Sequence, residues 1–268
     1  MSSLRAVFLD FDGTLADGGR VPDAHVEAVR AARKNNRVLL CTGRPKAMLK
    51  QVLPIGFDGI VASAGGYVEV NGEVLLDRRW SAPLAKRGIQ VLDEHDVAYL
   101  LESPESVLGR PGVDERIIRR LDLSGIDPEK LVPGLDIQMT DDLSGASFAK
   151  VSCFDSDVPV DQLAAEMGTE LAAVESSLPG EMKNSGEIYL KDVHKNDGAA
   201  IAAEALGVPQ SDVIAVGDGI NDLELLDYAG LGVAIEGADP RVLAVAQRLA
   251  PPPSEDGLAT LFTELGLV

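Results

Sequence analysis

The chain has 268 residues, of which 46% are hydrophobic and 25% are charged, and its formal net charge is -19. This composition is ordinary for a globular protein and long enough to bury a substantial core, which excludes a disordered chain. The negative charge repels nucleic-acid backbones and anionic lipid surfaces, so we expect neither nucleic acid nor a membrane as a partner.

The first residues, MSSLRAVFLDFDG, enter a strand-like run directly, without the basic region and long apolar stretch of a signal peptide. No segment approaches the roughly 18 uninterrupted apolar residues of a membrane span. We therefore expect a cytoplasmic protein. Cys41 and Cys153 lie in apolar runs without the paired spacing of a zinc site, and we interpret them as small buried hydrophobic residues.

Short apolar runs bounded by turn residues recur near both ends of the chain, and each has the length of a strand buried on both faces. These runs are Arg5–Leu9, Val38–Cys41, Gly59–Ala62, Val213–Val216 and Leu231–Ala234. Helical spacing over Pro22–Asn35 and Asp197–Leu206 separates some of them. Alternating strands and helices predict an α/β fold with a Rossmann-like parallel sheet.

The middle of the chain has a different pattern, in which predicted helices alternate with short strands. The helices are Leu84–Asp93 and Val160–Met167, and the strands are Ala98–Glu102, Leu135–Thr140 and Ala149–Phe154. This mixture predicts a smaller α+β domain over residues 81–187, inserted into a core domain of residues 1–80 and 188–268. Just before the insert, Asn71-Gly72 lies between alternating apolar runs and predicts a β-hairpin.

The first apolar run is followed by DFDGTL, which contains Asp10 and Asp12. Carboxylates at the end of a strand point into the crevice at the carboxyl edge of a parallel sheet, where such folds bind ligands. Where the strand opens into a loop, one of the pair can contact a metal with its side chain and the other with its backbone carbonyl. The alternative interpretation is a polar turn after a buried strand.

Two further segments offer groups that suit a phosphate. After the second run, CTGRP places the hydroxyl of Thr42 and the backbone of Gly43 at the end of another strand. The alternative for Thr42 is the N-cap of a helix after Pro45, and the two interpretations are not exclusive. Lys195 precedes a predicted helix, where its ammonium can bind a phosphate or neutralise crowded carboxylates. The alternative for Lys195 is an ordinary solvated surface lysine.

The fourth segment, GDGIND, follows the run Val213–Val216 and contains Asp218, Asn221 and Asp222. With the two aspartates of the first segment it gives four carboxylates at predicted strand ends. Clustered carboxylates repel one another unless a cation lies between them. Mg²⁺ prefers a few carboxylates together with water and phosphate oxygens, so the four segments predict a magnesium site.

These four segments, in this order, resemble the signature motifs of the haloacid dehalogenase-like superfamily of phosphotransferases. The long insert after the second motif resembles the Cof-like, type IIB subgroup, which carries a C2-type cap domain at that place. The similarity extends over SAGGYVEVNGEVL before the insert and over YAGLGVAIEGADPRV near the end. One departure is Gly65-Gly66, which stands where that subgroup more usually has Asn-Gly-Ala.

The resemblance implies a role for each carboxylate. Asp10 would be the nucleophile that forms an aspartyl-phosphate, and Asp12 would be the general acid for the leaving alkoxide and then the base for water. Mg²⁺ would be held by Asp10, the backbone carbonyl of Asp12 and Asp218. Asp222 would orient these ligands or bind the metal through water.

The resemblance also implies a clamp on the phosphoryl oxygens, formed by Thr42, the N–H of Gly43 and Lys195 and supported by Asn221. It predicts a Mg²⁺-dependent phosphatase for a small phosphorylated metabolite, such as a sugar phosphate. The alternatives are a phosphomutase of the same superfamily and a non-catalytic phospholigand-binding protein. Dehalogenation is disfavoured by the second carboxylate, Asp12. The substrate and the oligomeric state stay open.

Overall fold

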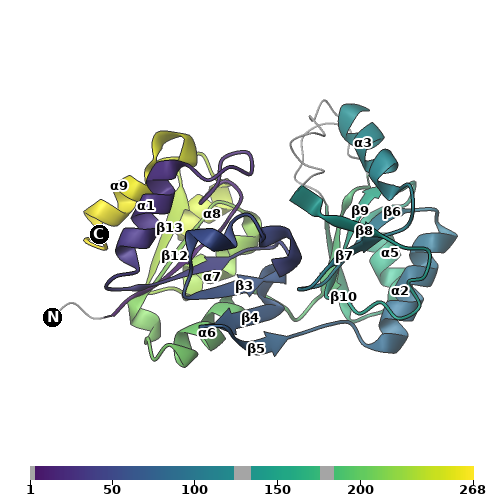
Figure 1. The fold of residues 1–268 in the computed structure, drawn as a ribbon, viewed down its shortest axis with the longest axis horizontal. Helices are drawn as coiled ribbons and strands as arrows, with labels where there is room; N and C mark the ends of the chain where they lie inside the picture. Colours follow the sequence, from purple (N-terminus) through teal and green to yellow (C-terminus); the bar gives the residue numbers. More distant parts are fainter. Residues whose placement is uncertain (1–3, 124–133, 176–183) are drawn as a thin grey trace. The chain divides into compact units, whose positions relative to one another are not determined.

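The computed structural model describes residues 4–123, 134–175 and 184–268, and the chain divides into two compact units (Figure 1). The first contains the chain up to Arg44, then Leu49–Asp77 and His194–Val268. The second contains Pro45–Met48 and Arg78–Val193. The second unit thus lies within the sequence of the first.

The first unit is built on an eight-stranded sheet with the order β14-β13-β12-β1-β2-β3-β4-β5. The strands from β14 to β3 are parallel, and β4 and β5 are antiparallel. Their bounds are β1 Ala6–Leu9, β2 Arg37–Cys41, β3 Gly59–Ala62, β4 Tyr67–Val70, β5 Glu73–Asp77, β12 Val213–Gly217, β13 Leu231–Ile235 and β14 Arg248–Ala250. β1 is central, with Phe8 opposite Ala215 on one side and Leu39 on the other. The predicted α/β fold with a parallel core is confirmed.

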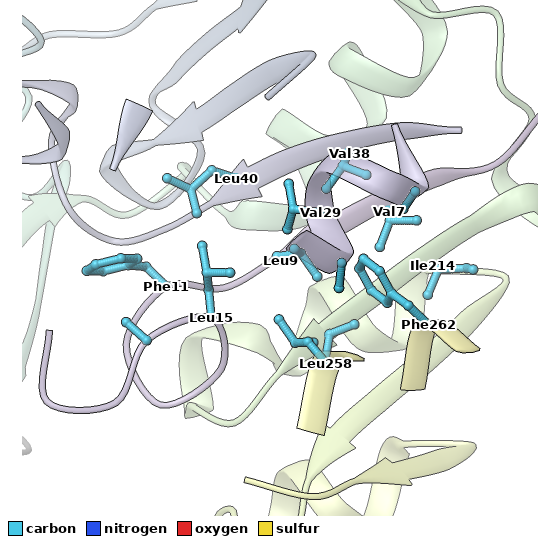
Figure 2. Close-up of a cluster of buried hydrophobic side chains, with 14 of the residues drawn as sticks. Val7, Leu9, Phe11, Leu15, Val29, Val38, Leu40, Ile214, Leu258 and Phe262 are labelled. Carbon is cyan, nitrogen blue, oxygen red and sulfur yellow. The ribbon is translucent and has the colours of Figure 1, made fainter. Parts of the chain in front are cut away.

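Helices cover both faces of this sheet, which explains the uninterrupted apolar runs in its strands. The helices are α1 Asp23–Ala32, α6 Lys195–Ala205, α7 Leu223–Tyr228, α8 Pro240–Val245 and α9 Gly257–Glu264. On one face, Val7 and Leu9 of β1 pack with Val29 of α1 and Phe262 of α9 (Figure 2). On the other face, Phe8 packs in a second cluster with side chains of α6, α7 and α8. Each fully buried side chain of this size contributes about 1.5–3 kcal/mol.

The first unit also contains short 3-10 turns and the predicted hairpin. The turns are η2 Leu53–Ile55, η3 Ser63–Gly65, η4 Gln210–Asp212, η5 Ile220–Asp222 and η6 Pro253–Glu255, while η1 spans Lys46–Leu49. The hairpin joins β4 to β5 through Asn71 and Gly72, which have φ values of 52° and 83°. Two consecutive positive φ values are what a tight hairpin turn requires, and Asn-Gly supplies them at low cost.

The second unit has a six-stranded sheet with the order β10-β11-β9-β6-β7-β8. Its elements are α2 Ala82–Glu94, β6 Ala98–Glu102, β7 Val107–Gly109, α3 Val113–Leu123, β8 Ile137–Met139, β9 Lys150–Asp155, α5 Val160–Met167, β10 Leu171–Glu175 and β11 Gly186–Leu190. All described neighbours in this sheet are antiparallel except β7 and β8. An α+β insert is therefore present. Both cysteines of the chain are buried and free.

The insert ends later in the chain than residue 187. β11 pairs with β9 and β10 in the second sheet, so a boundary at 187/188 would cut this strand in two. The long segment of the second unit instead runs from Arg78 to Val193. Its two ends are joined by an ion pair, because Nη2 of Arg78 lies 2.8 Å from Oδ2 of Asp192 and Nη1 donates to the carbonyl of Asp192.

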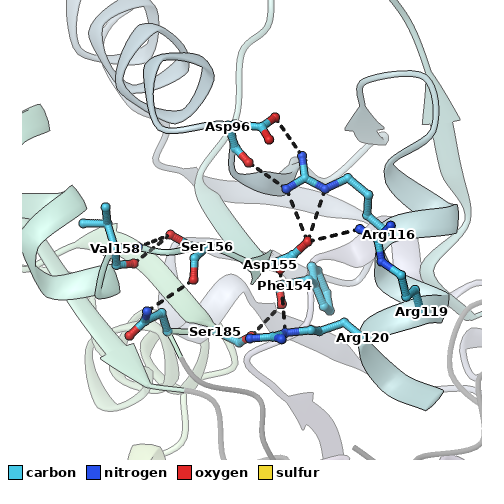
Figure 3. A network of polar contacts seen from close by, with 10 residues as sticks. Asp96, Arg116, Arg119, Arg120, Phe154, Asp155, Ser156, Val158 and Ser185 are labelled. Carbon is cyan, nitrogen blue, oxygen red and sulfur yellow. Dashed lines mark hydrogen bonds and ion pairs between the residues drawn. The ribbon is translucent and has the colours of Figure 1, made fainter. Parts of the chain in front are cut away.

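A polar network fastens α3 to β9 within the second unit (Figure 3). The carboxylate of Asp155 lies 3.3 Å from Nη2 of Arg116, 3.6 Å from Nη2 of Arg119 and 3.7 Å from Nε of Arg120. Arg116 also reaches Asp96 at 3.0 Å. One carboxylate thus meets three guanidinium groups from one face of one helix.

Across the described residues, no helix combines the length and the apolar character needed to cross a bilayer.

Candidate active site

Asp10 continues β1 at its carboxyl end, where its N–H donates to the carbonyl of Val216 on the neighbouring strand at 2.9 Å. This extension of the ladder fixes the backbone of Asp10 at the edge of the sheet. Its side chain is buried, and burial raises the pKa of Asp10, although Lys195 opposes the shift. A carboxylate in this position therefore needs nearby positive charge to stay ionised.

Lys195 provides such a charge from the first turn of α6. Its Nζ donates to Oδ1 of Asp10 and to Oδ1 of Asp222, both at 2.6 Å, and only 1% of the residue is exposed. Burial by itself lowers the pKa of Lys195, but the two carboxylates outweigh burial and raise it. The lysine is therefore a charged, buried group between two aspartates, and the solvated-surface interpretation is wrong.

The loop after β12 supplies Asp218 and Asp222. Asp222 is fully buried, and its Oδ2 accepts from the backbone N–H groups of Asp218 at 3.2 Å and Gly219 at 3.0 Å. Because its other oxygen binds Lys195, Asp222 fixes both the loop and the lysine. Asp218 accepts a 2.7 Å hydrogen bond from the hydroxyl of Thr14, and burial raises the pKa of Asp218.

Asp10, Asp218 and Asp222 can each place one carboxylate oxygen within 4.8 Å of the others. Three hard oxygen donors at this spacing fit a hard divalent cation such as Mg²⁺, whose charge would also offset the repulsion within the cluster. Asp12 is not in the group, because its carboxylate contacts Arg44 instead. The expected contact of Asp12 with the metal through its backbone carbonyl stays a prediction.

Gly13 allows the first loop to approach this cluster. Its φ is +81°, and a Cβ atom at this position would overlap the carboxylate of Asp218, with Oδ1 at 2.9 Å and closer contacts to Cγ and Oδ2. Asp218 therefore occupies the space that a side chain at residue 13 would fill. Thr14, one residue further, holds the same carboxylate by its hydroxyl, a contact that the sequence did not identify.

The loop Thr42–Arg44 lies at the end of β2. Thr42 extends the sheet through its N–H, which donates to the carbonyl of Val61 at 2.8 Å, and its hydroxyl accepts from the N–H of Arg44 at 3.1 Å. The hydroxyl therefore closes a local turn and caps no α-helix, so the helix-cap interpretation is wrong. Gly43 lies beside Asn221, whose Nδ2 would be 3.5 Å from a Cβ built on the glycine.

A left-handed turn after β3 positions the start of α6. Ser63 and Ala64 have φ values of 49° and 55°, and Gly65 has a φ of +107°. A Cβ on Gly65 would overlap the carbonyl of His194, with the N of Lys195 at 3.2 Å. The glycine thus lets this turn pack against the backbone that carries Lys195. Gly65 therefore has a local packing role.

The fold and this cluster together define an α/β enzyme with a carboxylate and lysine centre at the edge of its parallel sheet. The family model for haloacid dehalogenase-like hydrolases matches residues 7–262, and the chain belongs to that family. The resemblance found in the motifs is thereby confirmed.

Full-length relatives and solved structures agree with this assignment. The chain is 26% identical over 265 residues to a phosphoglycolate phosphatase of Methanothermobacter thermautotrophicus, covering 96% of each chain. A second phosphoglycolate phosphatase, from Archaeoglobus fulgidus, is 26% identical and covers 98% of each chain. The prediction of a phosphatase enzyme is confirmed at this level.

Two solved structures share the fold over nearly the whole chain. One is a phosphatase of the same superfamily from Bacteroides thetaiotaomicron, with a TM-score of 0.78 and 21% identity, covering 99% of this chain and 96% of that one. The other is a sugar phosphatase of subclass IIB, with a TM-score of 0.75 and 21% identity, covering 98% of this chain and 100% of that one. The order of elements in the present chain, including the inserted unit, is thus that of a known fold.

Proposed function

We propose that this phosphatase hydrolyses a phosphate monoester of a small metabolite, most simply a sugar phosphate, with Mg²⁺ as its cofactor. The observation that carries the proposal is the convergence of Asp10, Asp218 and Asp222 around the buried ammonium of Lys195. Phosphoryl transfer chiefly requires positioning and charge stabilisation, and this cluster offers both. One relative is named a phosphoglycolate phosphatase and one solved structure is described as a sugar phosphatase, which supports a small phosphate monoester as the substrate.

The reaction would proceed in two displacements at phosphorus. An oxygen of Asp10 attacks phosphorus, the bond to the leaving oxygen breaks, and that oxygen keeps the electron pair and takes a proton from Asp12. Water then attacks the aspartyl-phosphate while Asp12 removes its proton. The bond between phosphorus and Asp10 breaks, its electron pair returns to the carboxylate, and inorganic phosphate leaves.

The free oxygen of Asp10 supports its role as the attacking group. Among the described residues, Oδ1 accepts from Lys195, whereas Oδ2 accepts no hydrogen bond. Lys195 therefore orients the carboxylate by one oxygen and leaves the other for phosphorus. The second displacement regenerates the hydrogen-bonded pair of Asp10 and Lys195.

The carboxylates of Asp10 and Asp218 and the carbonyl of Asp12 would hold Mg²⁺, and Asp222 would keep the loop and Lys195 in place. When bound, the metal supplies positive charge that offsets repulsion between Asp10 and the phosphoryl group. Thr42, the N–H of Gly43 and Lys195 would contact the phosphoryl oxygens, with Asn221 beside Gly43 supporting that loop. These assignments are the ones expected from the sequence.

A turnover assay tests the proposal. With 4-nitrophenyl phosphate as substrate, we expect hydrolysis that requires Mg²⁺ and that is abolished in Asp10→Asn, a nearly isosteric change that removes the nucleophile. Circular dichroism checks that the variant is folded. A phosphorylated protein trapped by acid quenching of the wild type, and absent from Asp10→Asn, would identify the intermediate.

A panel of sugar phosphates, polyol phosphates, nucleotides and phosphoglycolate then defines the substrate. Slow hydrolysis that is stimulated by a bisphosphorylated sugar would favour a phosphomutase instead. Tight binding of a phosphorylated ligand without turnover would favour a non-catalytic binding protein. Turnover that is insensitive to both EDTA and Asp10→Asn would overturn the proposed chemistry.

A further inference from the structure

The side chain of Asp12 is held by one residue. It is 52% exposed, and within the described part of the chain its carboxylate is bound only by Arg44. Nε of Arg44 donates to Oδ2 and Nη2 donates to Oδ1, each at 2.7 Å. This is the two-point geometry in which a guanidinium fixes the plane of a carboxylate as well as its position.

Arg44 is itself fixed at several points. Its guanidinium carbon lies 4.9 Å from the ring centroid of the buried Phe11, between the two aspartates in sequence. Its N–H donates to the hydroxyl of Thr42 at 3.1 Å, and its carbonyl accepts from the N–H of Ser63 at 3.0 Å. A planar cation held on an aromatic face from a pinned backbone has little freedom, so it can serve as a fixed support.

From this arrangement we infer that Arg44 is a positioning residue for Asp12, an inference that rests on the proposed function. One carboxylate oxygen stays on the guanidinium while the other turns to the oxygen of the leaving group. An exposed aspartate without this support would sample several rotamers, and a small misplacement of a reacting group is costly in rate. An exposed ion pair adds little stability, so the value of this pair lies in its geometry.

The role predicts a dependence on the leaving group. An alkoxide leaving from a sugar or polyol phosphate needs the proton from Asp12, whereas 4-nitrophenolate leaves without it. General acid catalysis contributes about 10²–10⁴ in rate, so in the first displacement, measured as kcat/KM, Asp12→Asn should lose that factor on an alkyl phosphate and much less on 4-nitrophenyl phosphate. Arg44→Gln should show the same contrast, with a loss of at least about tenfold in kcat/KM on the alkyl phosphate and little change in KM.

The decisive experiment measures kcat and KM for both substrates in wild type, Asp12→Asn, Arg44→Gln, Arg44→Lys and the double variant. Arg44→Lys should behave like Arg44→Gln, because an ammonium cannot hold both oxygens. The double variant should be no slower than Asp12→Asn alone, since residues that act as one unit are not additive. Arg33→Gln is the matched control, because Arg33 makes a two-point pair with Asp58 at 3.1 Å beside the first residues of β2.

The possible failures are distinguishable. If Asp12→Asn loses the same factor in kcat/KM on both substrates, Asp12 is not the acid of the first displacement and the inference fails, whereas Mg²⁺-dependent turnover that is abolished in Asp10→Asn would still support the proposed function. If Asp12→Asn shows the contrast but Arg44→Gln raises KM for both substrates at unchanged kcat, Arg44 binds substrate and the inference is overturned. A loss in Arg33→Gln equal to that in Arg44→Gln would likewise overturn it, because the effect would then reflect general destabilisation.

Discussion

Nζ of Lys195 lies 2.6 Å from Oδ1 of Asp10, although 185 positions separate the two residues in the chain. Both residues are buried, so neither charge is screened by water, and each depends on the other for its ionised state. The orientation of the proposed nucleophile thus depends on a contact between the end of the first strand and a helix that follows the entire insert.

Replacing Lys195 by Met should remove most of the activity and weaken the fold. Asp10 and Asp222 would be buried together without a cation, and breaking a buried pair in this way costs about 3–5 kcal/mol. Urea unfolding in EDTA measures this loss. The double variant Lys195→Met, Asp222→Asn should recover part of the free energy of unfolding without recovering kcat; equal stability of wild type and single variant would contradict the charge pairing.

Gly13→Ala should disrupt the cluster through steric overlap with the carboxylate of Asp218. We expect a fall in kcat/KM of at least about a hundredfold, because displacement of a reacting or ligating group by about 1 Å is that costly. Gly19→Ala is the control, since Gly19 has the same φ of +81° but nothing within 4 Å of its Cβ position. Equal activity in the two alanine variants would show that the overlap is relieved without harm to the site.

The affinity for Mg²⁺ should depend on Asp218 and, to a smaller extent, on Thr14. Asp218→Asn removes a charged ligand, whereas Thr14→Val only removes the 2.7 Å hydrogen bond that orients it. Loss of such an outer contact typically weakens metal binding about 10–100-fold. Titration of activity with MgCl₂ and calorimetric titration of the protein with Mg²⁺ measure both effects. Unchanged Mg²⁺ affinity in Asp218→Asn would place the metal elsewhere.

Because of His25, the fold should be less stable in mild acid than at neutral pH. It is fully buried, its Nδ1 lies 2.9 Å from the carbonyl of Leu15, and its Nε2 accepts from the N–H of Leu258 at 3.1 Å. Since one nitrogen accepts, the ring is neutral, and burial lowers the pKa of His25. Below a pH of about 6.5 this histidine binds a proton in the unfolded chain but stays neutral in the folded chain. The free energy of unfolding therefore falls as the pH decreases, by up to about 1.4 kcal/mol per pH unit.

Urea unfolding at pH 7.5 and pH 5.5, compared between wild type and His25→Gln, isolates this contribution from that of the carboxylates. The variant should be less stable at pH 7.5 but should lose less stability between the two pH values. An identical loss in both proteins would show that His25 does not resist protonation in the folded state.

The main elements of the fold could be predicted because their causes are local. The run Gly59–Ala62 matches β3 at both ends, and Val160–Met167 matches α5, since apolar periodicity and turn residues bound each of them. The C-terminal boundary of the insert was placed too early. β11, GEIYL, is a short strand, and its pairing with β9 and β10 cannot be inferred from its own residues.

The candidate site, too, could be predicted only where local pattern determines it. The sequence identified Asp10 and Asp218 as strand-end carboxylates, because their positions follow from local pattern. It could not show that Lys195 is buried, since a buried charge needs partners that only the folded chain assembles. The pair of Asp12 and Arg44 was missed for a related reason: Arg44 was visible in the second motif, but no local signal indicates which carboxylate a guanidinium will meet.

The ion pair of Arg78 and Asp192 has a consequence for how this protein could be rebuilt. Because the two side chains touch at 2.8 Å, the segment Arg78–Val193 of the second unit begins and ends at neighbouring points. We therefore expect that a different insert, or a linker of a few residues, can join the same two points without stretching the hairpin on one side or α6 on the other.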